Sequence, residues 1–283
     1  PKKILLVELG PGDGTLCKDL LNTFKKFKDF YNSLEINLLE VSNQLKKIQK
    51  KKINNKKVKW IKTVEEINEG PVIILANEFF DALPIKQIFK ENKSFFEKYV
   101  TLSKDKKKIE FLKKKADKDL IKNIRKLNLI TYGNTIEYPI KALKFLKVIA
   151  KKIDKYDGGF LTFDYGYKIK KNKDTLQSIK KHRQLGALIN PGSSDLTSHV
   201  NFKLFNEFLN KHNLDVDKIV TQSEFLKKMG ILERANILSK KMTFNAKANM
   251  FYRLKRLLDP KEMGYLFKVM FARKKNRNFS LGF

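Results

Sequence analysis

The stretch "VELGPGDGTL" (Val7–Leu16) decides the fold, because it joins an apolar strand to a helix through a glycine turn. The preceding "KILLVEL" is a short run of leucine and β-branched residues, which predicts a buried strand. The following "TLCKDLLNTFKKF" places its large apolar residues on one face of a helix. Between them, Gly10, Gly12 and Gly14 occupy alternate positions directly after Glu8. A strand, a glycine turn and a helix in this order indicate a site where the backbone approaches a ligand closely.

The segments after this unit repeat the same alternation of strand and helix. "LEINLLEVS" (34–42), "VKWIK" (58–62) and "PVIILANEFFDALP" (71–84) predict three more strands, and the last of them breaks into a polar loop at Asn77. "NQLKKIQKK" predicts a helix after the first of these strands. Apolar strands with short connections of this kind predict an α/β fold with a doubly wound, mostly parallel sheet, which is a Rossmann-like architecture.

The pattern changes after residue 84. Residues 85–114 alternate and turn at "ENK" and "SKDKK", which predicts an inserted region of antiparallel hairpins. A helix is expected over about 140–153, and "FLTFDYGY" (160–167) predicts a buried strand that rejoins the sheet. We therefore expect residues 1–84 to form the first half of the Rossmann-like domain, 85–139 the antiparallel insertion, and 140–283 the second half with loops on the acceptor side.

Composition excludes some classes of function and leaves others open. The chain has 283 residues, 42% of them hydrophobic, so it can bury a substantial core. The sequence has no apolar run of about 18 residues, so it predicts no membrane-spanning helix. The net charge of +31 suggests nucleic acid, yet only seven of the 61 basic residues are arginine and the lysines are spread along the whole chain. Readers of nucleic acid favour arginine in a concentrated patch, so a nucleic-acid partner is not expected.

The glycine turn suits S-adenosylmethionine better than a dinucleotide. A dinucleotide fold places its third glycine one residue later, and its helix N-terminus faces a pyrophosphate. An acidic residue at the strand end favours a cationic or hydroxyl-rich ligand, and Glu40 ends the second strand, where a carboxylate accepts hydrogen bonds from both ribose hydroxyls. The residues expected to bind this cofactor are Glu8, Gly10, Pro11, Gly12, Gly14, Glu40, Val41 and Asn77.

A second polar cluster follows the fourth strand. Asn77, Glu78 and Asp81 come directly after five apolar residues, where a methyl acceptor would meet the sulfonium. Asn and Asp also cap helices, so Asp81 has a structural interpretation as well as a catalytic one. Glu78 stands beside two phenylalanines, which is a costly place for a carboxylate without a role. Glu78 and Asp81 are therefore the candidate catalytic residues.

Several motifs together resemble the MidA family of class I methyltransferases, which includes the mitochondrial complex I assembly arginine methyltransferase. They are "VELGPGDGTL", "LLEVSNQL", "ANEFFDALPIKQ", "FDYGY", "TLQSIKKHRQLGALINPGSSDLTSHVNF" and "MGYLFKV", in the family's order along essentially the whole chain. In the family a further N-terminal region helps to cover the site, and this chain begins after it. Asp13 stands where the family commonly has a basic residue, which we interpret as a surface change.

The resemblance implies an S-adenosylmethionine-dependent protein arginine methyltransferase that acts on a respiratory complex I subunit and modifies the arginine symmetrically. A carboxylate bound fork to fork with the guanidinium would then fix the nitrogen, with Glu78 first and Asp81 or Asp164 second. No metal site is expected, because the histidines lack companions at ligand spacing. The candidate acceptor-binding residues are Phe79, Phe80, Asp164, Tyr165, His182, Asp195 and His199; for each of them a packing role is a second interpretation.

Two other functions remain open from the sequence. One is an RNA or DNA methyltransferase, although no prolines follow Asn77 as they do in the motif of base-modifying enzymes. The other is a catalytically silent assembly chaperone on a methyltransferase fold. The single cysteine, Cys17, precludes an internal disulfide and fits a reducing compartment. The expected location is the cytoplasm if the source is bacterial and the mitochondrial matrix if it is eukaryotic.

Overall fold

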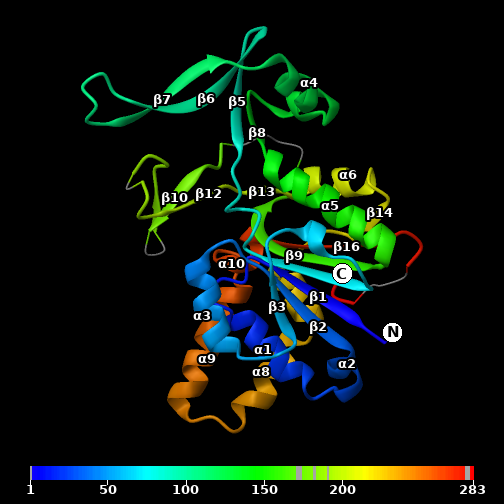
Figure 1. The fold of residues 1–283 in the computed structure, drawn as a ribbon. Coiled ribbons are helices and arrows are strands. Elements are labelled where there is room, and N and C mark those ends of the chain that lie inside the picture. Colours follow the sequence, from blue (N-terminus) through cyan, green and yellow to red (C-terminus); the bar gives the residue numbers. More distant parts are fainter. Residues whose placement is uncertain (1, 170–173, 181–182, 190, 278–280) are drawn as a thin grey trace.

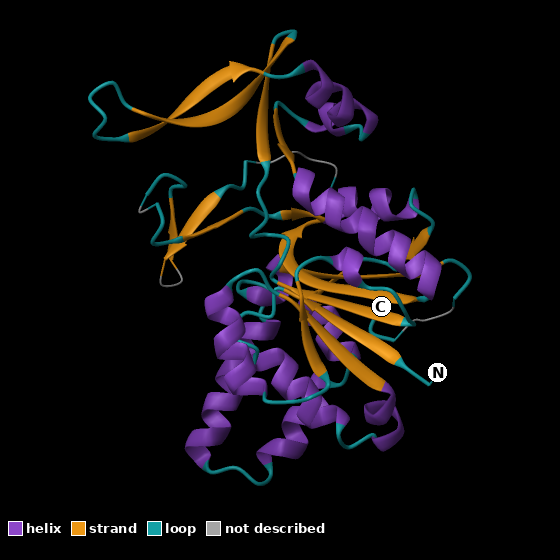
Figure 2. Cartoon of the chain, in the orientation of Figure 1, coloured by secondary structure: helices purple, strands orange, loops and turns teal. Residues whose placement is uncertain are grey.

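A nine-stranded sheet with helices on both faces forms the centre of the molecule (Figures 1 and 2). The computed structural model describes residues 2–169, 174–180, 183–189, 191–277 and 281–283. Five strands run parallel in the order β9-β4-β1-β2-β3. Their bounds are β1 Ile4–Leu9, β2 Leu34–Leu39, β3 Val58–Ile61, β4 Val72–Asn77 and β9 Gly158–Tyr167. The doubly wound, mostly parallel sheet that the sequence predicts is confirmed.

Antiparallel strands complete the sheet beyond β9. β16 (Phe267–Lys274) pairs antiparallel with β9, and β14 (Leu214–Val216) pairs antiparallel with β16. Two very short strands, β13 (Val200–Asn201) and β15 (Val220–Thr221), pair with β9 and β16. β15 has only two residues, because the chain enters helix α7 at Gln222.

Alternation along β1 divides the core between the two faces of the sheet. Leu5, Val7 and Leu9 pack on the face that α5 and α6 cover, whereas Leu6 packs with Leu21 of α1 on the other face. The helices of the two faces are well separated in Figure 1. Their bounds are α1 Thr15–Phe24, α2 Lys28–Ser33, α3 Asn43–Ile53, α5 Ile140–Tyr156, α6 Phe202–Asn210, α7 Gln222–Lys228, α8 Ile231–Ser239, α9 Phe244–Leu258 and α10 Met263–Leu266, with a short 3₁₀ helix η1 at Val64–Glu66.

A four-stranded antiparallel sheet lies between β4 and α5 in the chain. Its strands, in spatial order β7-β6-β5-β8, are β7 Ile109–Lys115, β6 Ser94–Leu102, β5 Lys86–Glu91 and β8 Thr135–Tyr138. Helix α4 (Lys118–Lys126) and the 3₁₀ helix η2 (Leu129–Tyr132) connect β7 to β8. The hairpins follow the sequence prediction, but β8 was not predicted, because four residues are too few to show a period.

A small third sheet lies within residues 140–283, where the sequence analysis expects loops on the acceptor side. Its order is β11-β10-β12, with β10 at Gln177–Lys180, β11 at Arg183–Leu185 and β12 at Asp195–Thr197. These strands have three or four residues each, so alternation cannot reveal them in the sequence. Among the helices that the structure describes, none combines the length and apolar character needed to cross a bilayer.

Candidate active site

The glycine turn lies at the carboxyl end of β1 and leads into α1. Gly10, Gly12 and Gly14 have φ of 64°, 54° and 83°, the left-handed region that other residues rarely adopt. The amide of Gly14 donates to the carbonyl oxygen of the buried Pro11 at 2.8 Å, which closes the turn. A Cβ on Gly10 would stand 2.8 Å from a ring carbon of Phe79, whereas one on Gly12 would meet nothing within 4 Å. The turn is therefore packed at Gly10 and open at Gly12.

Glu8 is the last polar residue of β1 and is almost completely buried. Its Oε2 has no hydrogen-bond partner within the described part of the structure. Burial raises the pKa of Glu8 from 4.5 to about 7. A buried carboxylate oxygen without a partner at a ligand-binding turn is suited to accept a hydrogen bond from a ligand ammonium or hydroxyl group.

A buried hydrogen-bond network ties the end of β2 to the glycine turn. Gln49 of α3 donates from Nε2 to the Gly12 carbonyl oxygen at 2.7 Å and to Oε2 of Glu40 at 3.1 Å. Its Oε1 accepts from the indole of Trp60 at 2.8 Å. Oε1 of Glu40 accepts from the Ser42 amide at 2.8 Å, so both carboxylate oxygens are fixed in place. Each oxygen keeps further lone pairs for a ribose hydroxyl.

The end of β4 carries a backbone outlier at Glu78. This residue has φ of 50°, and its amide donates to the carbonyl oxygen of Phe163 at 2.9 Å. A left-handed conformation is uncommon at a glutamate, and strained residues of this kind cluster at active sites and ligand clamps. The side chain reaches solvent, where the Asn77 amide donates to it at 3.3 Å. Surrounding protein and the Asp81 carboxylate raise the pKa of Glu78.

Asp164 at the end of β9 lies beneath the loop that carries Glu78. It is fully buried, and its Oδ2 accepts from the amides of Phe80 at 3.0 Å and Asp81 at 3.2 Å. Its Oδ1 accepts from the Tyr165 amide at 2.9 Å. Burial, followed by the charge of Asp81, raises the pKa of Asp164. The sequence places Asp164 among the acceptor-binding residues; its contacts hold the loop.

Asp81 stands beside Asp164 with one oxygen free. The residue is almost completely buried, and its Oδ1 has no hydrogen-bond partner among the described residues. The Tyr165 hydroxyl lies next to the Asp81 carboxylate, and burial together with this neighbour raises the pKa of Tyr165, which keeps the phenol protonated. Burial is the main cause that raises the pKa of Asp81. Glu78, Asp81 and Asp164 thus form an acidic cluster, in which a bound cation would stabilise the ionised carboxylates.

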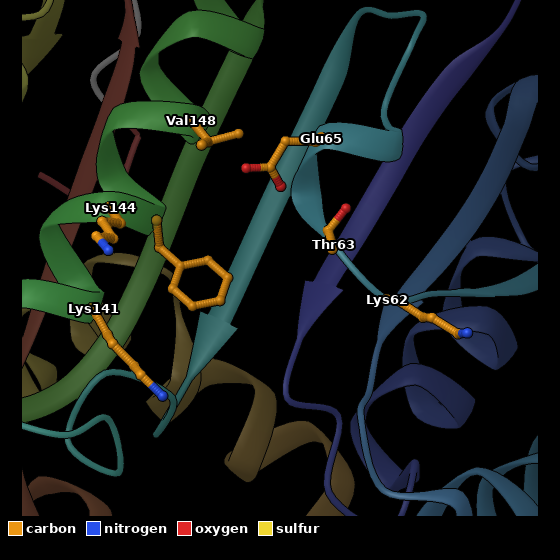
Figure 3. A pocket seen from close by; sticks show the side chains of 7 residues that line it. Lys62, Thr63, Glu65, Lys141, Lys144 and Val148 are labelled. Atoms are coloured by element: carbon orange, nitrogen blue, oxygen red, sulfur yellow. The ribbon is translucent and has the colours of Figure 1, made fainter.

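A cavity of about 360 Å³ lies between η1 and α5 at the carboxyl end of β3; we call it the α5 cavity (Figure 3). Figure 3 shows Val148 of α5 facing Thr63 and Glu65 across it, and Phe145 of α5 also lines it. The Phe145 ring packs edge-on against Phe79 at 5.2 Å between centroids. The cavity therefore borders the glycine turn through Phe79. The residues that line it are Lys62, Thr63, Glu65, Lys141, Lys144, Phe145 and Val148.

The remaining predicted residues lie in different surroundings. Phe80 is buried in the core against Phe160 and Phe205, so its side chain packs away from the acidic cluster. The His199 ring contacts Tyr165 at 5.9 Å between centroids. Exposed Asp195 is near enough for its charge to act on Asp81. Val41 is 78% exposed at the end of β2.

His182 lies outside the described residues. No group of three or more His, Cys, Asp and Glu side chains that could hold a metal ion occurs in the described ranges. Asp13, exposed in the turn, forms an ion pair with Lys52, which satisfies this acidic residue at the surface.

Comparison with known proteins identifies the family. The family model described as "Putative S-adenosyl-L-methionine-dependent methyltransferase" matches residues 1–220. The chain belongs to this family. It is the MidA family that the sequence resembles, and S-adenosylmethionine is the cofactor of this methyltransferase.

Relatives and solved structures agree with this assignment. The mitochondrial protein arginine methyltransferase NDUFAF7 of Xenopus tropicalis is 28% identical, over 95% of this chain and 67% of the relative. The homologous Caenorhabditis elegans protein is 31% identical, over 81% and 58%. The chain thus spans about two thirds or less of the length of these curated relatives. A Burkholderia thailandensis crystal structure with bound S-adenosyl-homocysteine has a TM-score of 0.81, with 22% identity over 99% of this chain and 74% of that one, which supports the fold.

The methyltransferase offers groups that fit its cofactor. The free Oε2 of Glu8 suits the amino group, and the held carboxylate of Glu40 suits the ribose hydroxyls. The open space at Gly12 lets the backbone approach the ligand. All three features lie at the carboxyl ends of β1 and β2, which pair in parallel.

Sequence reasoning missed Gln49, although it joins Gly12 and Glu40. Nothing in a lysine-rich helix distinguishes one glutamine, and Gly12 is 37 residues away in the chain. It also missed a second buried network, in which Glu137 of β8 accepts from the Thr175 amide at 2.8 Å and from the Gln87 side chain at 2.9 Å. A glutamate in a four-residue strand gives no sequence signal of this role.

We predict that Gln49→Leu weakens both folding and cofactor binding. The substitution leaves the Trp60 N–H and Glu40 Oε2 without the partner that Gln49 provides. Lost buried hydrogen bonds of this kind should lower the free energy of unfolding by about 2–4 kcal/mol. Calorimetry should also show about tenfold weaker binding of S-adenosylmethionine. The control is Gln44→Leu on the exposed face of the same helix; equal affinity in both variants would contradict the role of Gln49.

A second prediction concerns the pH dependence that Glu8 imposes on the unliganded protein. Because its folded pKa is raised, Glu8 stabilises the fold fully below the unfolded pKa of 4.5, and this contribution is lost as the pH rises through about 7. Relative to Glu8→Gln, wild type should lose about 3 kcal/mol of unfolding free energy between pH 4.5 and pH 8. Denaturant titrations at both pH values test this. A difference between the two proteins that does not change with pH would show that Glu8 ionises normally.

Proposed function

We propose that this methyltransferase transfers the methyl group of S-adenosylmethionine to an arginine side chain of a protein. The acidic cluster carries the proposal, because Glu78, Asp81 and Asp164 lie together at the ends of β4 and β9, beside the glycine turn. A guanidinium is a planar cation that carboxylates bind in pairs of parallel hydrogen bonds. The curated relatives are named protein arginine methyltransferases, which supports the same acceptor.

Each carboxylate of the cluster has a distinct part in the proposal. Asp164 holds the loop through two amides, so it positions Asp81 and Glu78. The free Oδ1 of Asp81 would accept a guanidinium N–H, and the Tyr165 hydroxyl orients the carboxylate for this bond. Glu78 reaches solvent at the mouth of the cluster, and its raised pKa makes it a better proton acceptor than an ordinary surface carboxylate.

The bound cofactor supplies a methyl group on a sulfonium, an electrophile that reacts by in-line displacement. A protonated guanidinium is a poor nucleophile, so the chain must orient one nitrogen and take up the proton that leaves as the new N–C bond forms. Glu78 does both when it binds the guanidinium fork to fork. The α5 cavity would hold the adenine ring of the cofactor, because its apolar wall of Phe145 and Val148 suits a flat ring next to Phe79.

We propose that the acceptor protein is the 49-kDa-type subunit of NADH dehydrogenase. One of its arginines would be dimethylated symmetrically during complex I assembly, as the family resemblance implies. The curated eukaryotic relatives are mitochondrial by name, which supports the mitochondrial matrix for a eukaryotic source. A bacterial source would place the same reaction in the cytoplasm.

The experiment that tests the proposal offers the chain a labelled methyl donor and the purified 49-kDa-type subunit. Mass spectrometry should find symmetric dimethylarginine on that subunit. Calorimetry with S-adenosylmethionine accompanies it, because a silent chaperone would bind the cofactor weakly or not at all. In a parallel experiment, the chain and the labelled donor are added to a mixed lysate. If nuclease rather than protease removes the label, the result would contradict the proposal and favour a nucleic-acid methyltransferase.

We predict that Glu78→Gln lowers kcat by about 100-fold or more, the usual effect of losing an acid–base or positioning group. The amide keeps the shape of the side chain but cannot take the proton or pair with the guanidinium. The affinity for S-adenosylmethionine should remain unchanged in calorimetry. The matched control is Glu233→Gln, which makes the same substitution at an exposed glutamate of α8. Turnover near that of wild type would remove Glu78 from the mechanism.

A further inference from the structure

The β6–β7 hairpin carries large apolar side chains on its surface. We call Val100, Leu102, Ile109 and Phe111 the ribbon patch. In the antiparallel register Val100 pairs with Phe111 and Leu102 with Ile109, so all four side chains stand on one face. Val100, Leu102 and Phe111 are 60%, 56% and 42% exposed. Apolar residues that cluster on one exposed face mark an interaction site.

The surroundings of the ribbon patch are strongly basic. Eight lysines and three acidic residues lie between Ser94 and Lys115. In the described part of the chain, no ion pair engages the four lysines of the β6–β7 turn, which are Lys104, Lys106, Lys107 and Lys108. The one acidic residue of that turn, Asp105, accepts instead from Ser103 and from the Lys107 amide. A partner that covers the apolar residues must therefore bring acidic side chains to these lysines.

The hairpin is connected to the acidic cluster through a series of buried and partly buried hydrogen bonds. Gln87 of β5 donates to Glu137 at 2.9 Å and to Asp174 at 2.8 Å. Glu137 accepts from the Thr175 hydroxyl at 2.6 Å, and that hydroxyl accepts from the His199 amide at 2.9 Å. These bonds fix the sheet that carries the hairpin to the chain at His199, next to the acceptor site.

Ser198, the neighbour of His199 in the chain, contacts the loop of the acidic cluster. The amide of Ser198 donates to the Asp81 carbonyl oxygen at 3.0 Å. Lys98 of β6 forms an ion pair with Asp174 and lies 4.1 Å from the centre of the Phe111 ring, so it connects Asp174 to the ribbon patch. A protein held at the hairpin is therefore held in a defined position relative to Asp81.

We infer that the ribbon patch is the docking surface for the folded acceptor protein, which presents an apolar surface with acidic residues around it. The inference rests on the proposed protein methyltransferase activity. β7 is an edge strand of its sheet, so no neighbouring strand blocks the approach (Figure 1). A nucleic acid fits less well, because the exposed residues are mainly aliphatic and residues 94–115 contain no arginine.

The test compares a folded acceptor with a short one. The triple variant Val100→Ser, Leu102→Ser and Phe111→Ser replaces the three exposed side chains of the ribbon patch. Tyr99→Ser with Leu112→Ser is the control on the opposite face of the hairpin. The substrates are the 49-kDa-type subunit and a short peptide that contains its arginine. The triple variant should raise KM for the folded subunit at least tenfold, with kcat and the KM for the peptide unchanged. The control variant should behave as wild type.

Direct binding of the subunit separates this inference from the proposed function. If wild type transfers no methyl group, the proposed activity fails, while calorimetry still compares the affinity of wild type and triple variant for the folded subunit. Equal affinity of the two, no binding by wild type, or an equal loss with the peptide would overturn the docking surface. Loss of binding to a single-stranded RNA 20-mer, with subunit binding unchanged, would also overturn it.

Discussion

Parallel pairing of β1 with β2 and with β4 is the constraint on which the site depends. Each parallel strand ends at the same edge of the sheet, so residues that are far apart in the chain meet there. Glu8, Glu40 and Glu78 follow or end three such strands. The glycine turn connects β1 to α1 at that edge. Its glycines have positive φ values, and the space around Gly12 is open. Without the parallel register, neither the cofactor groups nor the acidic cluster would form.

The acidic character of the edge explains the choice of ligand. A pyrophosphate at the glycine turn would face the buried side chain of Glu8, whose carboxylate would repel it when ionised. A sulfonium nucleoside with an amino group has the opposite charge where Glu8 lies. The same reasoning applies to the acceptor, because the charge of Asp81 raises the pKa of Asp164, and a guanidinium would relieve that repulsion. In the proposed reaction, cofactor and acceptor are thus both cations that approach one acidic edge.

The sequence predicts those parts of the site that local pattern determines. The strand, glycine turn and helix are contiguous in the chain, and Glu40 and Glu78 each end or follow an apolar strand, so their position at the edge follows from the sheet alone. Gln49 could not be predicted, because its role depends on contacts with Gly12, Glu40 and Trp60 that only the tertiary fold creates.

Side-chain direction is the second limit of the sequence. Phe79 and Phe80 are neighbours, yet one lies against Gly10 and the other in the core, and nothing local distinguishes them. Strand length is a further limit. The sequence did not reveal β8 or the three short strands of the β10 sheet, because strands of three or four residues show no period. Asp164 likewise required the structure, which shows that it holds the loop from 83 residues away.

A crystal structure of the chain with S-adenosyl-homocysteine tests the central claim most directly. The account predicts the amino group of the ligand within hydrogen-bond distance of Oε2 of Glu8 and both ribose hydroxyls on the carboxylate of Glu40, with the homocysteine sulfur facing Glu78. Density for the ligand at another place, or a glycine turn that binds NAD in preference, would contradict it.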